Sequence, residues 1–458
     1  MIISGKLPAP FFEYFVKSAT LERDAALTKN DSIMNQNTLR AKRTTLRLLD
    51  ALVPRQLTGA VGIRLWDGTR WPDARPRATT VALNFPGALR TIFGSGSELG
   101  MGEGYLRNEF DIEGDIENVL LLADQLGLNR LGLGRKVLLA RQLLRLPRAS
   151  EGLTPRAPAR LSGQRHSRAR DRQAVAYHYN ASNDFYALWL DPQMVYSCAY
   201  FEQPTDDIGV AQTRKLDLIC RKLRLQPGQK LLDIGCGWGA LLIHAAKHYG
   251  VEATGITLSR PQVEWARRRI AEENLESRCR VLERDYRELK ATQPYDALAS
   301  IGMFEHVGVR MLPQYFEQAG HLLKPGGVFL NHGVALNAKH FPPSRKRNFI
   351  DAYVFPDGET MPINYTLRVA EASGFEVRDV ESLREHYLLT LRAWVRRLEE
   401  NHERALGLVD EATYRVWRLY MASSAYGFAT NRITIFQTLL LCPRGQSSLP
   451  LTRHDWYC

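Results

Sequence analysis

The stretch LLDIGCGWGAL, residues 231–241, decides the fold. It joins a short apolar run to three alternating glycines and a second apolar run, which predicts a buried strand, a tight turn and a helix. Asp233 stands just before the turn, where a carboxylate is unfavourable beside a pyrophosphate but favourable beside an ammonium or a sulfonium. The turn is therefore predicted to bind S-adenosylmethionine rather than a nicotinamide dinucleotide.

Strand-like and helix-like segments alternate on both sides of this turn. This alternation predicts an α/β fold with a seven-stranded and mostly parallel sheet, and the turn with Asp233 makes it a Rossmann-like fold of the class I methyltransferase type. Two inserts, 335–366 and 389–430, are expected over the carboxyl edge, where open α/β sheets bind ligands. The predicted strands are 230–235, 251–256, 280–285, 295–302, 326–334, 375–383 and 433–441.

Residues that follow the predicted strands are candidates for cofactor binding. The second strand ends in GITLS, without the acidic residue that usually binds ribose hydroxyls, so polar contacts are expected from Thr257 and Gln262. Tyr286 and Arg287 are placed to flank the adenine, although Tyr286 also suits an aromatic core. The predicted set is Asp233, Gly235, Gly237, Gly239, Thr257, Leu258, Gln262, Tyr286 and Arg287.

Composition predicts two domains. Residues 141–172 hold nine arginines, three prolines and few large apolar residues, which is typical of a mobile linker. Residues 173–458 would form the catalytic domain and residues 1–140 a smaller accessory α+β domain, related to lipid binding or dimerisation. In that domain the pattern predicts a helix at 44–53, strands at 61–68 and 79–85, and a loop from residue 100 followed by a helix near Asp115.

Charge is concentrated in the front of the chain. Residues 1–172 hold 27 Lys and Arg against 17 Asp and Glu, within a total net charge of +12 over 458 residues. Nucleic-acid motifs are absent, so the expected partner is an anionic membrane surface and not a nucleic acid. No apolar run reaches 18 residues, no signal peptide is recognised, and the six scattered cysteines suit a reducing cytoplasm and no metal site. A cytoplasmic protein at the inner membrane face is expected, and a homodimer is left open.

Six segments in fixed order resemble the cyclopropane-fatty-acyl-phospholipid synthases and the related mycolic acid cyclopropane synthases. The resemblance is strong over 175–442 and weaker around GEGYLRNEFDIEGD. The segments are HYNASNDFYALWLDPQMVYSCAYF (178–201), LLDIGCGWG (231–239), GITLS (255–259), SIGMFEHVG (300–308), FLNHG (329–333) and HYLLTLRAW (386–394).

The resemblance implies a reaction and a set of catalytic residues. In this family the methyl of S-adenosylmethionine converts a cis double bond of a phospholipid acyl chain into a cyclopropane, and bound bicarbonate acts as the base. The bicarbonate site implied here is Cys198, Glu305, His332 and Tyr387 with the Ile301 backbone, and Tyr196 and Ser197 join the cofactor set.

Cys198 admits three interpretations: packing, a nucleophile, or part of an anion site. The resemblance implies the third, and the nucleophile is disfavoured because no base adjoins Cys198 in sequence, although distant partners stay open. Aromatic and apolar residues of the inserts suit the walls of an acyl pocket, although each alone fits core packing: Phe349, Tyr353, Val354, Phe355, Trp394, Tyr420, Tyr426 and Phe428.

Other functions would use the same cofactor-binding part of the catalytic domain. The alternatives are a fatty-acyl C-methyltransferase that leaves methyl-branched or methylene chains, and a small-molecule N-methyltransferase. A lipid- or nucleic-acid-binding protein with a degenerate cofactor fold is disfavoured by the intact glycines and Asp233.

Overall fold

The computed structural model describes residues 36–94, 97–126, 132–148, 156–179, 181–290, 293–341, 347–443 and 449–457. The chain forms two compact units. The first comprises Met1–Gly96 and Arg107–Gly152, and the second comprises Ser97–Leu106 and Leu153–Cys458.

The first unit is an α+β module built on a four-stranded sheet of order β2-β1-β3-β4. The strands are β1 (Val61–Arg64), β2 (Arg70–Trp71), β3 (Thr79–Leu83) and β4 (Phe110–Glu113), and the helices are α2 (Ala88–Gly94), α4 (Ile116–Gln125) and α5 (Leu133–Leu143). A further helix covers the described residues 36–52. Asp115 caps α4 by accepting a hydrogen bond from the Glu117 amide, as the predicted helix start requires.

One segment of this region differs from the prediction. The expected loop from residue 100 is the helix α3 (Glu98–Leu106), which belongs to the second unit, and β4 follows it. Its glycines weaken helix propensity, but they allow close packing. A Cβ atom on Gly102 would lie 2.3 Å from the Cδ2 atom of Phe349, a residue almost 250 positions later.

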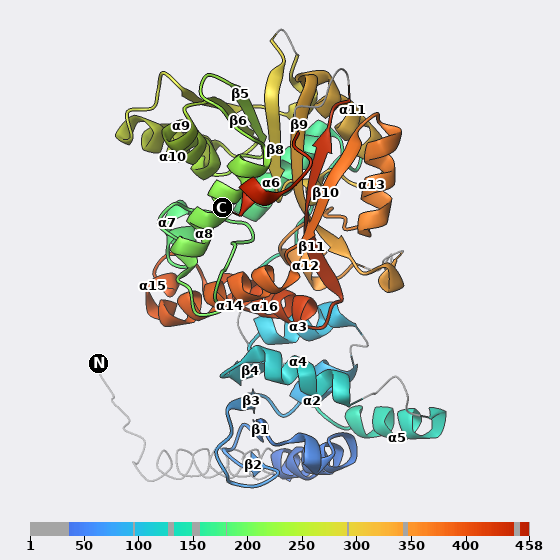
Figure 1. The fold of residues 1–458 in the computed structure, drawn as a ribbon. Coiled ribbons are helices and arrows are strands. Elements are labelled where there is room, and N and C mark those ends of the chain that lie inside the picture. Colours follow the sequence, from blue (N-terminus) through green and yellow to red (C-terminus); the bar gives the residue numbers. More distant parts are fainter. Residues whose placement is uncertain are drawn as a thin grey trace, which may run out of the picture. The chain divides into compact units, whose positions relative to one another are not determined.

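The second unit contains the predicted seven-stranded sheet, in the order β10-β11-β9-β8-β5-β6-β7 (Figure 1). Pairing is parallel from β9 through β8, β5 and β6 to β7, and antiparallel where β11 joins β9 and β10. The predicted strands and the mostly parallel class are confirmed. The bounds are β5 (Lys230–Ile234), β6 (Glu252–Thr257), β7 (Cys279–Glu283), β8 (Tyr295–Ile301), β9 (Leu323–Leu336), β10 (Glu376–Ser382) and β11 (Ile433–Leu441).

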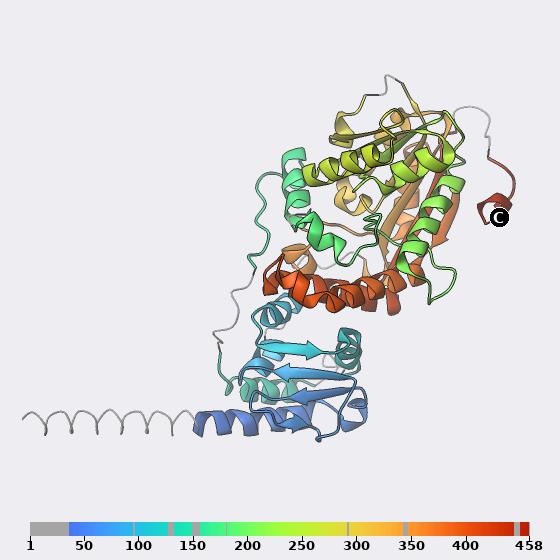
Figure 2. The ribbon, with the colours of Figure 1, turned by 90° about the vertical axis from the view of Figure 1, so that its left-hand side faces the viewer.

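Helices cover both faces of this sheet (Figures 1 and 2). The helices α8 (Ile208–Lys222), α9 (Ala240–Tyr249) and α10 (Arg260–Glu272) share one apolar core, and α11 (Leu312–Leu322) and α13 (Ile363–Ala372) share the other. The inserts supply α12 (Phe349–Tyr353), α14 (Arg384–Glu400), α15 (His402–Leu406) and α16 (Glu411–Ala429), of which α14 and α16 pack side by side.

The predicted linker is not uniform. Its described residues 156–172 make fixed contacts within the second unit and include the start of α6 (Arg168–Tyr179), which precedes the short α7 (Asn183–Ala187). The Ala159 amide donates to the Ala352 carbonyl at 2.8 Å, and Arg170 pairs with Asp357. Arginines that composition assigns to solvent therefore have carboxylate partners in this part of the segment, and its mobility stays a prediction.

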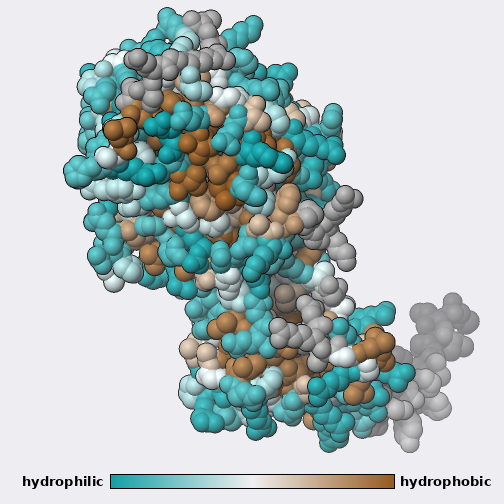
Figure 3. Space-filling view, turned by 45° about the vertical axis from the view of Figure 1, so that its right-hand side comes forward, coloured by the Kyte–Doolittle hydropathy of each residue, from teal (hydrophilic) through white to brown (hydrophobic). Residues whose placement is uncertain are grey.

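The surface shown in Figure 3 is mostly hydrophilic, with smaller areas of apolar residues. Within the described ranges, no helix combines the length and the apolar character needed to cross a bilayer.

Candidate functional site

A cavity opens where the parallel strands of the second unit end. Residues that follow β5, β6, β7 and β8 line it, together with residues of α6 and α8. The predicted cofactor residues in its lining are Tyr196, Ser197, Asp233, Gly235, Gly237, Thr257, Leu258, Gln262, Tyr286 and Arg287. Gly239 is outside the lining; it is the N-cap of α9, where a Cβ atom would lie 3.0 Å from Ala266 Cβ.

The glycines of the turn meet two requirements: a left-handed backbone conformation and the lack of a Cβ atom. Gly235 and Gly237 have φ angles of 82° and 54°, in the left-handed region that favours glycine. A Cβ on Gly235 would lie 2.6 Å from Met303 Cβ, so this glycine permits close packing. A Cβ on Gly237 would meet nothing within 4 Å, so that position faces open space in the cavity.

Two buried groups of opposite charge line the cavity. Asp233 is 2% exposed and its Oδ1 atom has no hydrogen-bond partner, while Lys215 on α8 is 1% exposed and donates to Ser197 Oγ at 2.8 Å. Burial raises the pKa of Asp233 to about 7, against the opposing charge of Lys215, and burial lowers the pKa of Lys215 to about 8. An unpartnered buried carboxylate is costly, so Asp233 is prepared for a cationic ligand.

The end of β6 holds a second unsatisfied group. The Thr257 hydroxyl donates to Gln262 Oε1 at 2.7 Å, which fixes the amide orientation. Gln262 Nε2 is buried without a partner. This donor suits a ligand hydroxyl, in the role that an acidic residue takes in other folds of this class.

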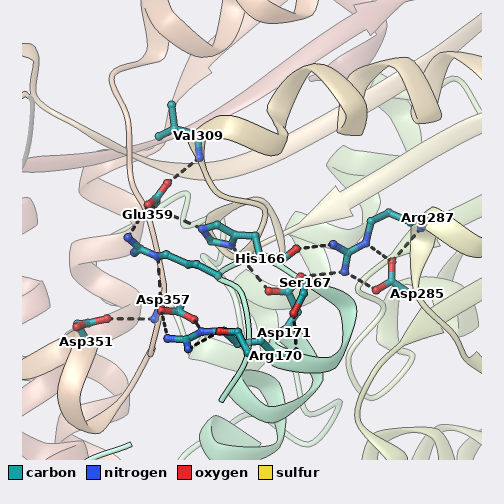
Figure 4. A network of polar contacts seen from close by, with 12 residues as sticks. His166, Ser167, Arg170, Asp171, Asp285, Arg287, Val309, Asp351, Asp357 and Glu359 are labelled. Carbon is teal, nitrogen blue, oxygen red and sulfur yellow. Dashed lines mark hydrogen bonds and ion pairs between the residues drawn. The ribbon is translucent and has the colours of Figure 1, made fainter. Parts of the chain in front are cut away.

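Arg287 belongs to a polar network beside the cavity (Figure 4). Its guanidinium pairs with Asp285 and Asp171 and donates to the His166 carbonyl at 3.0 Å. The His166 ring lies between Asp171 and Glu359, at 3.8 Å from each carboxylate. Arg287 therefore ties α6 to the loop after β7, and Tyr286, which lines the cavity and also joins the apolar core, is better placed to contact a ligand.

The predicted catalytic residues gather next to this cavity, but only Ile301 lines it. Ile301 pairs in register with His332 on β9, and the Gly302 amide donates to the His332 carbonyl at 2.9 Å. Glu305 Oε1 accepts from the Val334 amide at 2.6 Å. Cys198 and Tyr387 meet at Leu383, whose carbonyl accepts from the Cys198 thiol at 3.8 Å and from the Tyr387 amide at 3.0 Å.

Burial sets the charge state of these groups. It raises the pKa of the Glu305 carboxyl, whose Oε2 atom has no partner, and raises the pKa of the Cys198 thiol, which therefore stays neutral. Burial also raises the pKa of Tyr387, and nearby Tyr420, Cys198 and Glu305 add to this effect. A neutral thiol is a poor nucleophile, which agrees with the preference for Cys198 as part of a binding site.

The protonated nitrogen of His332 follows from a chain of contacts. Lys222 can only donate, and its Nζ donates to Gln437 Oε1 at 2.7 Å, so the Gln437 NH2 group faces His332 Nδ1 at 3.3 Å. Nδ1 must then accept, which places the proton on Nε2. Burial lowers the pKa of His332, so the ring is neutral, and its Nε2–H is a buried donor without a partner.

Comparisons with known proteins agree with this geometry. Residues 166–438 match the sequence profile of the family described as mycolic acid cyclopropane synthetase. The chain belongs to this family. A probable fatty acid methyltransferase of Pseudomonas putida is 37% identical over 86% of this chain and 95% of its own, and cyclopropane mycolic acid synthase 1 of Mycobacterium tuberculosis is 38% identical over 57% and 94%.

Solved structures of the family superpose on the same region. The cyclopropane synthase MmaA2 from Mycobacterium tuberculosis is 33% identical with a TM-score of 0.56, over 59% of this chain and 98% of its own. The mycolic acid cyclopropane synthase CmaA1, complexed with SAH and CTAB, is 35% identical with a TM-score of 0.56 over the same shares. The resemblance and the S-adenosylmethionine-dependent class are thus confirmed.

The groups that line the cavity suit the cofactor of this family. Asp233 Oδ1 and Gln262 Nε2 are buried and unpartnered, and Gly237 leaves open space, so the cavity fits S-adenosylmethionine. In the described residues, no cluster of His, Cys, Asp and Glu is arranged to hold a metal ion.

Sequence reasoning missed Lys215 and Gln437. Lys215 falls in phase with Ile208, Ala211 and Ile219 on the buried stripe of α8, and a lysine in an apolar stripe is the signal that could have found it.

Proposed function

We propose that the protein forms cyclopropane rings on unsaturated acyl chains of membrane phospholipids. The observation that carries this proposal is the pair of unpartnered buried atoms Glu305 Oε2 and His332 Nε2, next to the cofactor cavity. The ammonium formed by N-methylation can lose its proton to solvent, whereas a carbocation on an acyl chain in an apolar pocket needs a proton acceptor held beside it.

The residues fit S-adenosylmethionine and bicarbonate. S-adenosylmethionine, when bound, supplies the methyl carbon that becomes the third ring carbon. Bicarbonate, when bound, supplies an oxygen that accepts the proton as the ring closes. His332 Nε2–H is a donor for such an anion, and Glu305, with its pKa raised by burial, can donate in its protonated form.

The chain's own contribution is to hold this acceptor and exclude water. Aromatic rings pack around Tyr387: its ring centroid lies 4.8 Å from that of Phe428 and 6.0 Å from that of Trp394, which lies 5.3 Å from the ring of Tyr196. Burial raises the pKa of Tyr179 to about 12, so Tyr179 is a neutral neighbour. Because the wall is apolar and holds no strong nucleophile, a carbocation beside it is not trapped as a covalent adduct.

A second candidate is methyl transfer to the same double bond that ends in a methyl-branched or methylene chain. The 37% identity to the probable fatty acid methyltransferase of Pseudomonas putida favours it.

Methyl-labelled S-adenosylmethionine, incubated with the protein and oleoyl phospholipid vesicles, tests the lipid class. After saponification, the label is expected in the fatty-acid fraction. Label in the head-group amine, or in no lipid fraction, would contradict acyl-chain modification.

We also propose that α5 of the first unit attaches the protein peripherally to anionic lipid at the cytoplasmic face. Leu133, Val137 and Leu144 are 79%, 45% and 62% exposed and lie on one stripe at positions i, i+4 and i+11. Arg141 and Arg145 flank that stripe, and the sequence from 132 to 148 contains no acidic residue. A basic amphipathic helix fits an anionic bilayer, at about 1 kcal/mol per well-placed cation.

Sedimentation with anionic and neutral vesicles tests this attachment. The double variant Leu133→Ser/Leu144→Ser should lose most binding to anionic vesicles, and Leu121→Ser, an exposed apolar residue of α4, should not. Equal binding to neutral vesicles at low salt would contradict the proposal. A dimer that dissociates in the double variant, with unchanged vesicle binding, would assign the stripe to a second copy instead.

A further inference from the structure

Lys215 is a buried cation in a cavity that binds a cationic cofactor, and the polar site described so far gives it no role. It lines the cavity at 1% exposure, and the acceptor recorded for its ammonium is Ser197 Oγ at 2.8 Å. Asp233 lines the same cavity, and the charges of the two residues act on each other.

Lys215 donates to Ser197 and makes no direct hydrogen bond to Asp191 among the described residues. Asp191 is nearby and its charge also acts on Lys215. Its two carboxylate oxygens, however, already accept hydrogen bonds from the Val195 and Gln193 amides, at 2.9 and 3.0 Å. The Asp191 carboxylate therefore bonds to backbone amides of its own loop, and the Lys215 ammonium keeps N–H donors for another acceptor.

Asp233 alone would recognise only half of the amino-acid end of the cofactor. That end carries an ammonium and a carboxylate on one carbon. A carboxylate brought beside Asp233 without a compensating cation would lose its hydration and meet like charge. A buried ammonium in the same cavity supplies the missing partner.

We propose that Lys215, held by Ser197, binds the carboxylate of the amino-acid end of the cofactor, while Asp233 binds its ammonium. The inference rests on the cofactor assignment and deepens it: the pair forms a zwitterion site that selects an intact α-amino acid. S-adenosylhomocysteine and its decarboxylated analogue, S-adenosyl-3-thiopropylamine, differ by this carboxylate alone.

Calorimetric titration of the full chain with both compounds tests the proposal. The wild-type protein should bind the decarboxylated analogue about 30-fold or more weakly than S-adenosylhomocysteine, the scale for one partner lost from a buried charge pair. Lys215→Met should weaken S-adenosylhomocysteine by a similar factor and change affinity for the analogue by less than about threefold. Asp233→Asn should weaken both, because both retain the amine.

The same helix offers a matched control. Lys222 is also 1% exposed, but it contacts Gln437 and Glu381 outside the cavity. Lys222→Met should leave the affinity for S-adenosylhomocysteine unchanged. Thermal denaturation identifies variants that fail to fold, in which case the wild-type comparison decides alone.

Two outcomes would overturn the inference: equal wild-type affinity for the two compounds, or an equal loss for both in Lys215→Met, which would mean that the lysine acts through Asp233 or the fold. No binding of S-adenosylhomocysteine by the folded wild-type protein would instead contradict the cofactor assignment.

Discussion

At the residue scale, the tautomer of His332 depends on Gln437. Gln437→Glu keeps a partner for Lys222 but replaces the NH2 donor by a carboxylate that can only accept. The imidazole proton should move to Nδ1 and leave Nε2 without hydrogen, so turnover should fall by about 10²-fold, as for a lost preorganised donor. Calorimetry should show nearly unchanged affinity for S-adenosylhomocysteine. Normal turnover in this variant would remove His332 Nε2 from the anion site.

Substitutions of Glu305 and of Cys198 should reduce turnover to different extents. Glu305→Gln keeps the acceptor for the Val334 amide, and turnover should fall by about 10²-fold or more while cofactor binding persists. Cys198→Ser should be milder, because serine still donates to the carbonyls of Ala199 and Leu383. Rates with and without added bicarbonate provide the measurement. An inactive Cys198→Ser with a normal Glu305→Gln would assign the chemistry to the thiol.

Cofactor affinity should depend on pH through the two buried charges. The pKa of Asp233, raised to about 7, means that the carboxyl is neutral below this pH, so affinity should increase as pH rises through 7. The pKa of Lys215, lowered to about 8, means that affinity should decrease above it. The other charge acting on this lysine among nearby carboxylates is that of Asp191. Asp233→Asn should abolish the lower limb in calorimetric titrations with S-adenosylhomocysteine; a flat wild-type profile would contradict this charge assignment.

Asp233 should also affect folding. Its raised pKa means that the folded chain binds a proton more tightly than the unfolded chain, whose carboxyl titrates near 3.8. Its contribution to stability is therefore greatest below that value and declines as pH rises toward 7.

Cofactor residues were predictable where one motif holds them. The turn from Asp233 to Gly237 lines the cavity through consecutive residues, so the spacing within one motif was enough to predict their place. Lys215 and Gln437 were not predictable in this way, because each acts through a partner on another element: Ser197 for Lys215, and His332 for Gln437.

At the element scale, α3 shows how packing overrides propensity. Gly102→Ala should destabilise the protein by about 1–3 kcal/mol, because the new methyl group overlaps the Phe349 ring. Thermal denaturation measures the loss, and Phe349→Leu should restore part of it. Gly134→Ala on α5 is the control: its Cβ meets nothing within 4 Å, so stability should stay equal or rise. Equal effects at both sites would show that α3 does not pack on α12.

The helix α3 could not be predicted from its own sequence. Three glycines in GMGEGYL favour a loop, and the contacts that order the helix come from α12 and α16. The Tyr353 hydroxyl donates to Glu103 at 3.1 Å, and the Arg418 guanidinium donates to the Tyr105 hydroxyl at 3.0 Å. These partners are about 250 and 310 positions away, beyond the reach of local pattern.

At the scale of the whole molecule, the alternation of strands and helices was sufficient for the sheet. The strands β5, β8, β9 and β11 contain short apolar runs, whereas β6, β7 and β10 mix apolar with polar residues, so the local pattern indicated the seven strands with different clarity. Division into units was less accessible, because residues 97–106 and 156–172 join the second unit through distant carboxylates and rings. The composition of a segment indicates how much apolar surface it can bury by itself, but not which other segments pack over it.

The central claim is that the acyl double bond becomes a cyclopropane. Its most direct test is mass spectrometry of fatty acids formed from oleoyl phospholipid with S-adenosylmethionine carrying a fully deuterated methyl group. A cyclopropane gains one carbon, retains two of the three deuterons and has no remaining double bond. A methylene branch retains two deuterons but keeps a double bond. A saturated methyl branch formed by hydride transfer to the cation, from an added reductant, retains all three deuterons and carries two more hydrogens than the cyclopropane. The product predicted here has two deuterons and resists hydrogenation under conditions that reduce alkenes; a product with three deuterons, or one with a double bond, would contradict ring closure.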